Sequence, residues 1–242
     1  MMENILEIFL LTVGASFVQR TTGFGFGIFI MTILPFLMPS YGEATTLSGL
    51  LALTTSVMIA WKFRRYISWK RMIPILTTFI IVSATAICML SSIHDDTLRK
   101  VLGVTLMLTS LYFAFFSDRL RIKTTIPWQI GTGTVSGLMG GFFGMQGPPA
   151  VLYFISSEQD KDHYMAMTQT YFVIGNVMMT IVRASNGFLT ATVGKCYLFC
   201  LAAVLTGTLL GSWAFRHIPG KIFPHVVYGY IGICGILIFL TT

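Results

Sequence analysis

Charged residues are scarce in this chain. Only 10% of its 242 residues are Asp, Glu, Lys or Arg, whereas 55% are hydrophobic. Soluble domains carry about 25% charged residues, because these side chains face water. Nine acidic and 16 basic residues are too few to cover a soluble globule of this size. The composition excludes a soluble domain, a disordered chain and a collagen-like repeat, and it predicts a polytopic membrane protein.

Cysteines and catalytic motifs are also sparse. The four cysteines all lie inside apolar runs: Cys88, Cys196, Cys200 and Cys234. Two of them are four residues apart, which is not a CxxC spacing, and no histidine lies near enough to complete a metal site. We therefore expect buried packing residues, with no metal and no cofactor. The sequence contains no HExxH, GxSxG, Walker or dinucleotide motif, so we do not expect an enzyme.

Long stretches without charge are abundant. They cover residues 21–42, 44–61, 72–94, 101–117, 124–157, 164–182, 196–215 and 222–242. Nearly all have the roughly 17–25 residues that a helix needs to cross the hydrocarbon core of a bilayer. The longest, 124–157, has room for a helix and a second, shorter piece. The runs are continuous rather than alternating, so we predict an all-α polytopic helical bundle in the membrane.

Basic residues concentrate in one short segment, residues 61–71, with the sequence WKFRRYISWKR. Cations interleaved with aromatic rings could hold the phosphates of a nucleic acid and stack on its bases. Five cations in a short connection between two spans obey the positive-inside rule, and Trp and Tyr are typical of the membrane interface, so the segment fits the cytoplasmic side of a membrane protein better. We favour the second interpretation and expect no nucleic-acid partner.

Weak internal similarity divides the chain into two halves, 1–122 and 123–242, within one membrane domain. The glycine-rich segment 23–27 has a counterpart at 144–148, and the order of further matches is preserved at spacings of roughly 120 residues. A duplication of this length is typical of secondary transporters, whose halves are structural repeats.

Each half opens in the same way. A hydrophobic segment (5–19 or 127–143) runs into a glycine-rich interruption, and a short apolar piece follows (28–38 or 149–155). Each Gly costs a helix up to about 1 kcal/mol relative to Ala, and Pro suits the first turn of a new helix. We therefore predict a broken, re-entrant or discontinuous helix in each half. Such breaks expose helix N-termini that bind anions, although the glycines could also serve tight helix packing.

Two topologies remain open. Re-entrant openings make the halves inverted, whereas one long broken crossing per opening gives eight spans with parallel halves. The inverted arrangement keeps Lys161 on the cytoplasmic side with segment 61–71, and the parallel arrangement moves it outside. The positive-inside rule narrowly favours the inverted arrangement.

Arg20, one turn before the first glycine-rich interruption, is the best candidate for a charged residue inside the membrane. Its guanidinium suits the oxygens of a carboxylate or sulfonate, although snorkelling to an interface is an alternative. The candidate substrate-binding residues are Gln19, Arg20, Thr22, Gly23, Gly25, Gly27, Gly144, Gln146, Gly147, Gln169 and Asn176. The last two share a helix face, where they could line a cavity or join two helices.

Other charges are expected elsewhere. Arg183 lies near the end of a span and is expected at the surface. No carboxylate falls inside a span, so a proton coupled to transport would be carried by Glu43, His163 or the substrate itself.

The order of these features resembles the TauE/SafE family, the sulfite exporters also called TSUP transporters. The matching features are the glycine-rich interruptions followed by Pro35 and Pro149, the Ala-Thr-Thr start at 44–46, and the closing segment 207–219. The resemblance covers nearly the full length. It implies a secondary transporter, and more specifically an exporter, of sulfite or organosulfonates in a bacterial or archaeal inner membrane.

The resemblance leaves three further points open. Protons are a candidate coupling ion, and a homodimer is a candidate assembly. The alternatives to a sulfonate transporter are a carrier of another small organic anion and a scaffold or accessory subunit that transports nothing.

Overall fold

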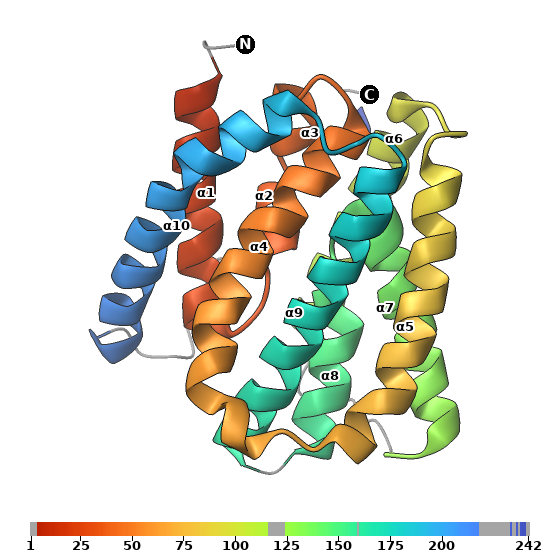
Figure 1. The fold of residues 1–242 in the computed structure, drawn as a ribbon, viewed down its shortest axis with the longest axis vertical. Helices are drawn as coiled ribbons and strands as arrows, with labels where there is room; N and C mark the ends of the chain where they lie inside the picture. Colours follow the sequence, from red (N-terminus) through yellow and green to blue (C-terminus); the bar gives the residue numbers. More distant parts are fainter. Residues whose placement is uncertain are drawn as a thin grey trace.

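Every regular element that the computed structural model describes, in residues 4–115, 124–158, 160–217, 233, 236 and 238–240, is a helix (Figure 1). The helices are α1 (Ile5–Thr22), α2 (Phe26–Ile30), α3 (Leu34–Leu37), α4 (Tyr41–Phe63), the 3-10 turn η1 (Arg64–Tyr66), α5 (Trp69–Leu90), α6 (Asp95–Phe115), α7 (Ile126–Phe143), α8 (Gly147–Ser157), α9 (Lys161–Ser185) and α10 (Ala191–His217). The all-α prediction is confirmed. The expected last span, 222–242, lies almost entirely outside the described residues, as does Cys234.

Four stretches are long and apolar enough to cross a membrane: Tyr41–Tyr66, Trp69–Leu90, Asp162–Ser185 and Ala191–Ala214. Large apolar side chains are exposed on the outer faces of the bundle, among them Leu10 at 61%, Leu108 at 62% and Leu209 at 71%. Polar side chains such as Gln19 and Asn176 are buried instead. This distribution is the reverse of a soluble protein and suits a bundle surrounded by lipid.

Three long helix pairs build the bundle: α1 packs along α10, α4 along α9, and α5 along α7 (Figure 1). Each pair joins one helix from the first half of the chain to one from the second, so the two halves are interleaved. Small residues allow the close approach. A Cβ at Gly133 would lie 2.7 Å from the carbonyl oxygen of Ile75, and a Cβ at Gly141 would lie 2.8 Å from that of Ser83. These glycines of α7 therefore serve helix packing.

Two helical hairpins reverse direction inside the molecule. The α1–α2 hairpin enters from the end that carries the N-terminus and α3, and the α7–α8 hairpin enters from the opposite end (Figure 1). The long helices α4 and α9 begin with side-chain caps that define their starts. Ser40 accepts a hydrogen bond from the amide of Glu43, and Asp160 accepts from the amides of Asp162 and His163.

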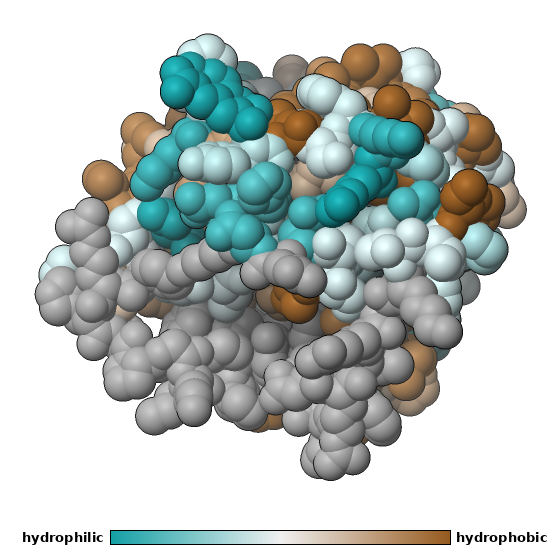
Figure 2. Space-filling model, turned by 90° about the horizontal axis from the view of Figure 1, so that it is seen from below, coloured by the Kyte–Doolittle hydropathy of each residue, from teal (hydrophilic) through white to brown (hydrophobic). Residues whose placement is uncertain are grey.

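The connections α4–α5 and α8–α9 lie at the same end of the bundle. Arg71 forms an ion pair of 3.3 Å with Glu158, and the rings of Tyr66 and His163 are 5.2 Å apart. Figure 2 looks onto this end, where hydrophilic side chains gather. All five cations of segment 61–71 are exposed. The His163 ring and amide lower the pKa of the Asp160 carboxyl by hydrogen bonding to it.

Two expectations about burial are wrong. Arg183 was expected at the surface, but it is 0% exposed, because the last turns of α9 still pack against α4 and α7. Cys88 was expected to be buried, but it is exposed on an outward face of α5, where an apolar thiol is compatible with lipid. Cys196 and Cys200 are buried, as predicted.

Candidate functional site

The first glycine segment ends α1 and turns the chain into α2. Gly23 and Gly25 have left-handed backbone angles (φ 84° and 96°), which a residue with a Cβ rarely adopts. The amide of Gly23 donates to the carbonyl of Gln19 at 2.9 Å and closes the last turn of α1. The Thr22 hydroxyl donates to the carbonyl of Phe24 at 2.6 Å. These bonds hold the reversal within three residues, so that α2 begins at Phe26.

The second glycine segment separates α7 from α8. Gly144 has φ 68° and its amide donates to the carbonyl of Gly140 at 3.0 Å. The carbonyl of Gln146 accepts a hydrogen bond from the Ser136 hydroxyl at 2.6 Å, and Ser136 accepts one from the Tyr171 hydroxyl at 2.9 Å. This chain of hydrogen bonds fixes the segment between α7 and α9.

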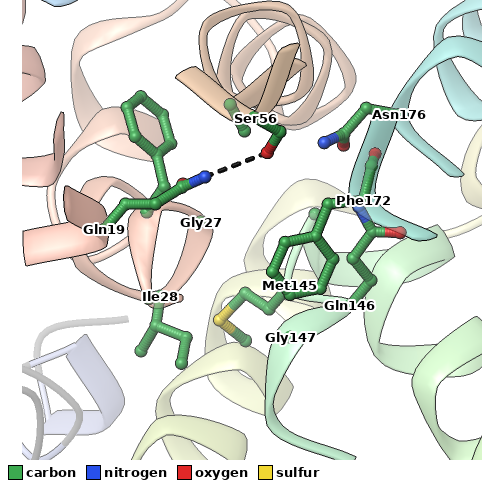
Figure 3. A pocket seen from close by; sticks show the side chains of 13 residues that line it. Gln19, Gly27, Ile28, Ser56, Met145, Gln146, Gly147, Phe172 and Asn176 are labelled. Atoms are coloured by element: carbon green, nitrogen blue, oxygen red, sulfur yellow. Dashed lines mark hydrogen bonds between the residues drawn. The ribbon is translucent and has the colours of Figure 1, made fainter. Parts of the chain in front are cut away.

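The two glycine segments touch each other in the centre of the bundle. A Cβ at Gly27 would overlap the carbonyl group of Gly144, so only glycine fits there without displacing the other segment. A small cavity of about 30 Å³ lies at this contact, bordered by α4 and α9 (Figure 3). It is lined by backbone from both segments, by the apolar side chains of Phe26, Met145 and Phe172, and by four polar side chains.

The polar side chains of the cavity come from four different parts of the fold: Gln19 on α1, Ser56 on α4, Gln146 before α8 and Asn176 on α9 (Figure 3). None of the lining residues is charged. The Gln19 amide donates to the Ser56 hydroxyl at 2.9 Å, and the Gln146 amide donates to the carbonyl of Phe172 at 3.4 Å. The Asn176 amide makes no hydrogen bond to the part of the protein that the structure describes.

Seven of the residues expected at the site line this cavity. They are Gln19, Gly25, Gly27, Gly144, Gln146, Gly147 and Asn176.

The other four expected residues lie around it. Gln169 donates to the carbonyl of Gly23 at 2.7 Å and so connects α9 to the first glycine segment. Thr22 is the last residue of α1, directly before this segment. Arg20 is half-buried and points toward α10, where its Nε donates to the Ser212 hydroxyl at 2.8 Å. Arg20 is therefore not among the lining residues of the cavity.

Sequence reasoning missed Ser56 and Phe172 at the cavity, and it missed the burial of Arg183. Nothing in the sequence distinguishes Ser56 or Phe172 from other residues of apolar helices. Arg183 had a signal, because it stands seven residues after Asn176 and fourteen after Gln169, on the same helix face. Its Nη1 donates to the carbonyl of Thr45 at 3.1 Å, and its Nη2 donates to those of Gly140 and Gly141 at 2.9 and 3.2 Å.

Comparison with known proteins fits a membrane bundle with a central polar cavity. The family model described as Sulfite exporter TauE/SafE matches residues 8–238, which include both glycine segments. The chain belongs to the TauE/SafE family. The resemblance stated from the sequence is thereby confirmed. TauE/SafE is a family of membrane transporters, and together with the four apolar helices this membership makes the chain a multi-pass membrane protein of a transporter family.

Among curated proteins, the chain is similar to a TauE/SafE protein of Cupriavidus necator (strain ATCC 17699), named "Probable sulfite/organosulfonate exporter TauE". The two are 24% identical over 201 residues, which cover 81% of this chain and 78% of the relative. No solved structure matches the chain.

Proposed function

We propose that this protein is a secondary transporter that exports small sulfur-containing anions, such as sulfite or organosulfonates, across a bacterial or archaeal inner membrane. Family membership over residues 8–238 and the name of the C. necator relative support the substrate class. The main support for the location of the substrate site is the central cavity, where both glycine segments meet four uncharged polar side chains.

The chemistry of the cavity suits a small oxyanion. A side-chain amide can donate two hydrogen bonds, and the Asn176 amide donates neither of them to the described protein. The Gln19 amide can exchange its bond to Ser56 for one to a ligand oxygen. Apolar side chains such as Phe172 and Met145 line the same space and lower its dielectric constant, which strengthens each polar contact made there.

The size of the cavity implies movement. Its 30 Å³ accommodates about two water molecules. A sulfite ion has four non-hydrogen atoms and needs more room. In our proposal the two glycine segments separate when the anion enters, and they expose it first to one side of the membrane and then to the other. Rocking of one repeat against the other around a midplane site is the usual form of such transport.

An inverted repeat is part of the proposal. The two hairpins enter the bundle from opposite ends, which is the arrangement that inversion of the halves requires (Figure 1). The ion pair between Arg71 and Glu158 supports it further, because it places the α8–α9 connection at the same end as the cationic segment 61–71. Parallel halves would put these two connections on opposite sides. By the positive-inside rule this shared end is cytoplasmic.

Coupling to protons needs a titratable group outside the cavity, because none of its lining residues titrates. Glu43 is the carboxylate to examine, since its Oε2 is buried without a hydrogen-bond partner in the described protein. If protons drive transport through it, Glu43→Gln will lose pH-driven accumulation and keep exchange of labelled for unlabelled substrate.

Thermal stabilisation of the purified protein by ligands tests the proposed site. The panel consists of sulfite, sulfoacetate, taurine, thiosulfate, lactate and chloride. A ligand that binds only the folded protein stabilises it by about 2.7 kcal/mol at 100 times its dissociation constant, which a melting curve resolves. We expect stabilisation by sulfite or a sulfonate, and its loss in Asn176→Leu.

The matched control is Asn186→Leu, because Asn186 lies at the end of α9 and its side chain bonds only to the carbonyl of Val182 among the described residues. It should retain the ligand effect. Stabilisation that survives Asn176→Leu would place the site elsewhere. No stabilisation by any of these anions would favour a membrane scaffold that transports nothing.

A further inference from the structure

The proposed site has no charge of its own. None of the residues that line the cavity is ionised. The α8 N-terminus compensates little, because Pro148 and Pro149 have no N–H group and remove two of the four donors that a first turn normally presents. Moving an anion from water into such a site is strongly unfavourable unless a positive charge lies close by. An anion transporter therefore needs a cation near this cavity.

Arg183 is the one charged residue with no exposed surface in the part of the chain that the structure describes. It stands two turns beyond Asn176 on the inward face of α9. No carboxylate lies within ion-pair distance of it among the described residues, and its Nε has no hydrogen-bond partner there. A buried guanidinium without a counter-ion is costly, and it becomes favourable when an anion is present.

The guanidinium lies close to Asn176, which lines the cavity. A Cβ at Gly49 on α4 would be 3.3 Å from Nη1 of Arg183 and 3.8 Å from Oδ1 of Asn176. Both groups are thus within 4 Å of one point at Gly49, and Asn176 lines the cavity. The carbonyl of Thr45, which accepts from Arg183, would also lie 3.7 Å from a Cβ at Gly144 in the cavity wall.

A second unpartnered group lies at the same place. The hydroxyl of Ser48 is fully buried, has no hydrogen-bond partner in the described protein, and would lie 3.7 Å from a Cβ at Gly144. The Ser48 hydroxyl and the Thr45 carbonyl that Arg183 holds therefore lie at the same distance from that point of the cavity wall. A hydroxyl that is buried without a partner is unfavourable until a ligand supplies one.

We propose that Arg183 is the residue that makes the cavity select anions, with the Ser48 hydroxyl as a hydrogen-bond donor beside it. This inference rests on the proposed function: Arg183 supplies the positive charge that is missing among the residues that line the proposed site. Arg183 attracts the anion from its place beside Gly49, and its bond to the Thr45 carbonyl can be given up when the anion approaches. The distances to the Gly49 Cβ position put Nη1 within about 7 Å of the Asn176 amide. For an anion at that separation and an effective dielectric constant of about 20, the attraction corresponds to roughly fiftyfold in affinity.

Structural capping is the competing role for Arg183. Its Nη2 bonds to two carbonyls in the last turn of α7, where a cation also stabilises the helix dipole. A purely structural arginine would affect the binding of anionic and neutral ligands alike. A charge that selects anions would affect the anionic ligand alone.

The test compares methanesulfonate with dimethyl sulfone, a neutral molecule of similar shape, by measuring the dissociation constant of each for the purified protein. The variants are Arg183→Gln, which removes the charge, and Arg183→Lys, which keeps it. Arg64→Gln is the control, because Arg64 is exposed at the cationic end and its loss removes the same charge far from the cavity.

We expect Arg183→Gln to weaken methanesulfonate binding by roughly fiftyfold and to leave sulfone binding unchanged. Arg183→Lys should keep most of the preference for the anion, and Arg64→Gln should match the wild type. If Arg183→Gln does not fold, the preference of the wild type for the anion tests the role of Arg183, and Ser48→Ala tests the role of Ser48. The wild type must bind methanesulfonate at least about tenfold more tightly than the sulfone, and Ser48→Ala must reduce that ratio.

The outcomes separate the two claims. A wild type that binds methanesulfonate, together with a folded Arg183→Gln variant that binds it equally well, would overturn the role of Arg183 alone. The same holds for a wild type that binds the anion and the sulfone equally, whereas a Ser48→Ala variant with an unchanged ratio would overturn the role of Ser48. A wild type that binds no sulfonate at all would overturn the proposed function.

Discussion

The contact between the two glycine segments can be tested by adding one methyl group. In Gly27→Ala the new Cβ would overlap the carbonyl group of Gly144, and a backbone atom cannot rotate away as a flexible side chain can. Overpacking of this kind costs about 1–3 kcal/mol of stability. For a chain of this size that corresponds to a fall of about 2–12 °C in melting temperature. The cavity changes as well, because Gly27 and Gly144 both line it.

The assay is thermal unfolding of the purified protein in detergent, with and without sulfite. Gly131→Ala is the matched control, because no atom lies within 4 Å of the position that a Cβ would take there. It should leave the melting temperature unchanged or raise it slightly, since Ala favours a helix over Gly by up to about 1 kcal/mol. Sulfite should stabilise this control as it stabilises the wild type, and it should stabilise Gly27→Ala less.

The reasoning would be refuted if Gly27→Ala melted at the wild-type temperature and kept the full effect of sulfite. It would also be refuted if Gly131→Ala were destabilised to the same degree, because the loss would then come from any added methyl group rather than from the contact between the two segments.

Three further predictions concern the residues around the cavity. Arg20→Gln removes the hydrogen bond to Ser212 and should lower the melting temperature while sulfite still binds. Loss of sulfite binding in a variant of normal stability would instead make Arg20 a direct ligand. Ser136→Ala leaves the Gln146 carbonyl without its donor, so we expect a loss of about 1–3 kcal/mol of stability in thermal unfolding and weaker sulfite binding. No change in either would contradict the role given to that hydrogen bond. Gly141→Ala forces α7 away from α5 and should lower the yield of folded protein on size-exclusion chromatography, whereas normal folding would show that these helices do not need the close approach.

The sequence predicted the positions of the helix ends at Gly23 and Gly144 well, because glycine in an apolar run is a strong local signal. It also predicted a long helix and a shorter one in 124–157, which are α7 and α8. Seven of the expected site residues line one cavity. Six of them stand in or beside the two glycine segments, which meet, and the seventh, Asn176, reaches the cavity from α9.

The misses have a common physical cause. Local sequence predicts where a helix ends, but burial depends on which helices pack together. The Ser185-Asn186-Gly187 sequence marks the end of α9 and suggested a surface position for Arg183. The packing of α9 against α4 and α7 buries Arg183 instead. The role of Arg20 as a ligand of the anion stays a prediction, and its Nε donates to the Ser212 hydroxyl on α10.

Transport by the purified protein in liposomes tests the central claim most directly. Liposomes loaded with labelled sulfite are prepared with the wild type, with Asn176→Leu and without protein, and the release of label is followed over time. We predict saturable release by the wild type, inhibited by an organosulfonate, and at least about tenfold slower release by Asn176→Leu. Release by the wild type at the rate of protein-free liposomes, or by Asn176→Leu at the wild-type rate, would contradict a sulfur-anion transporter with its site between the two glycine segments.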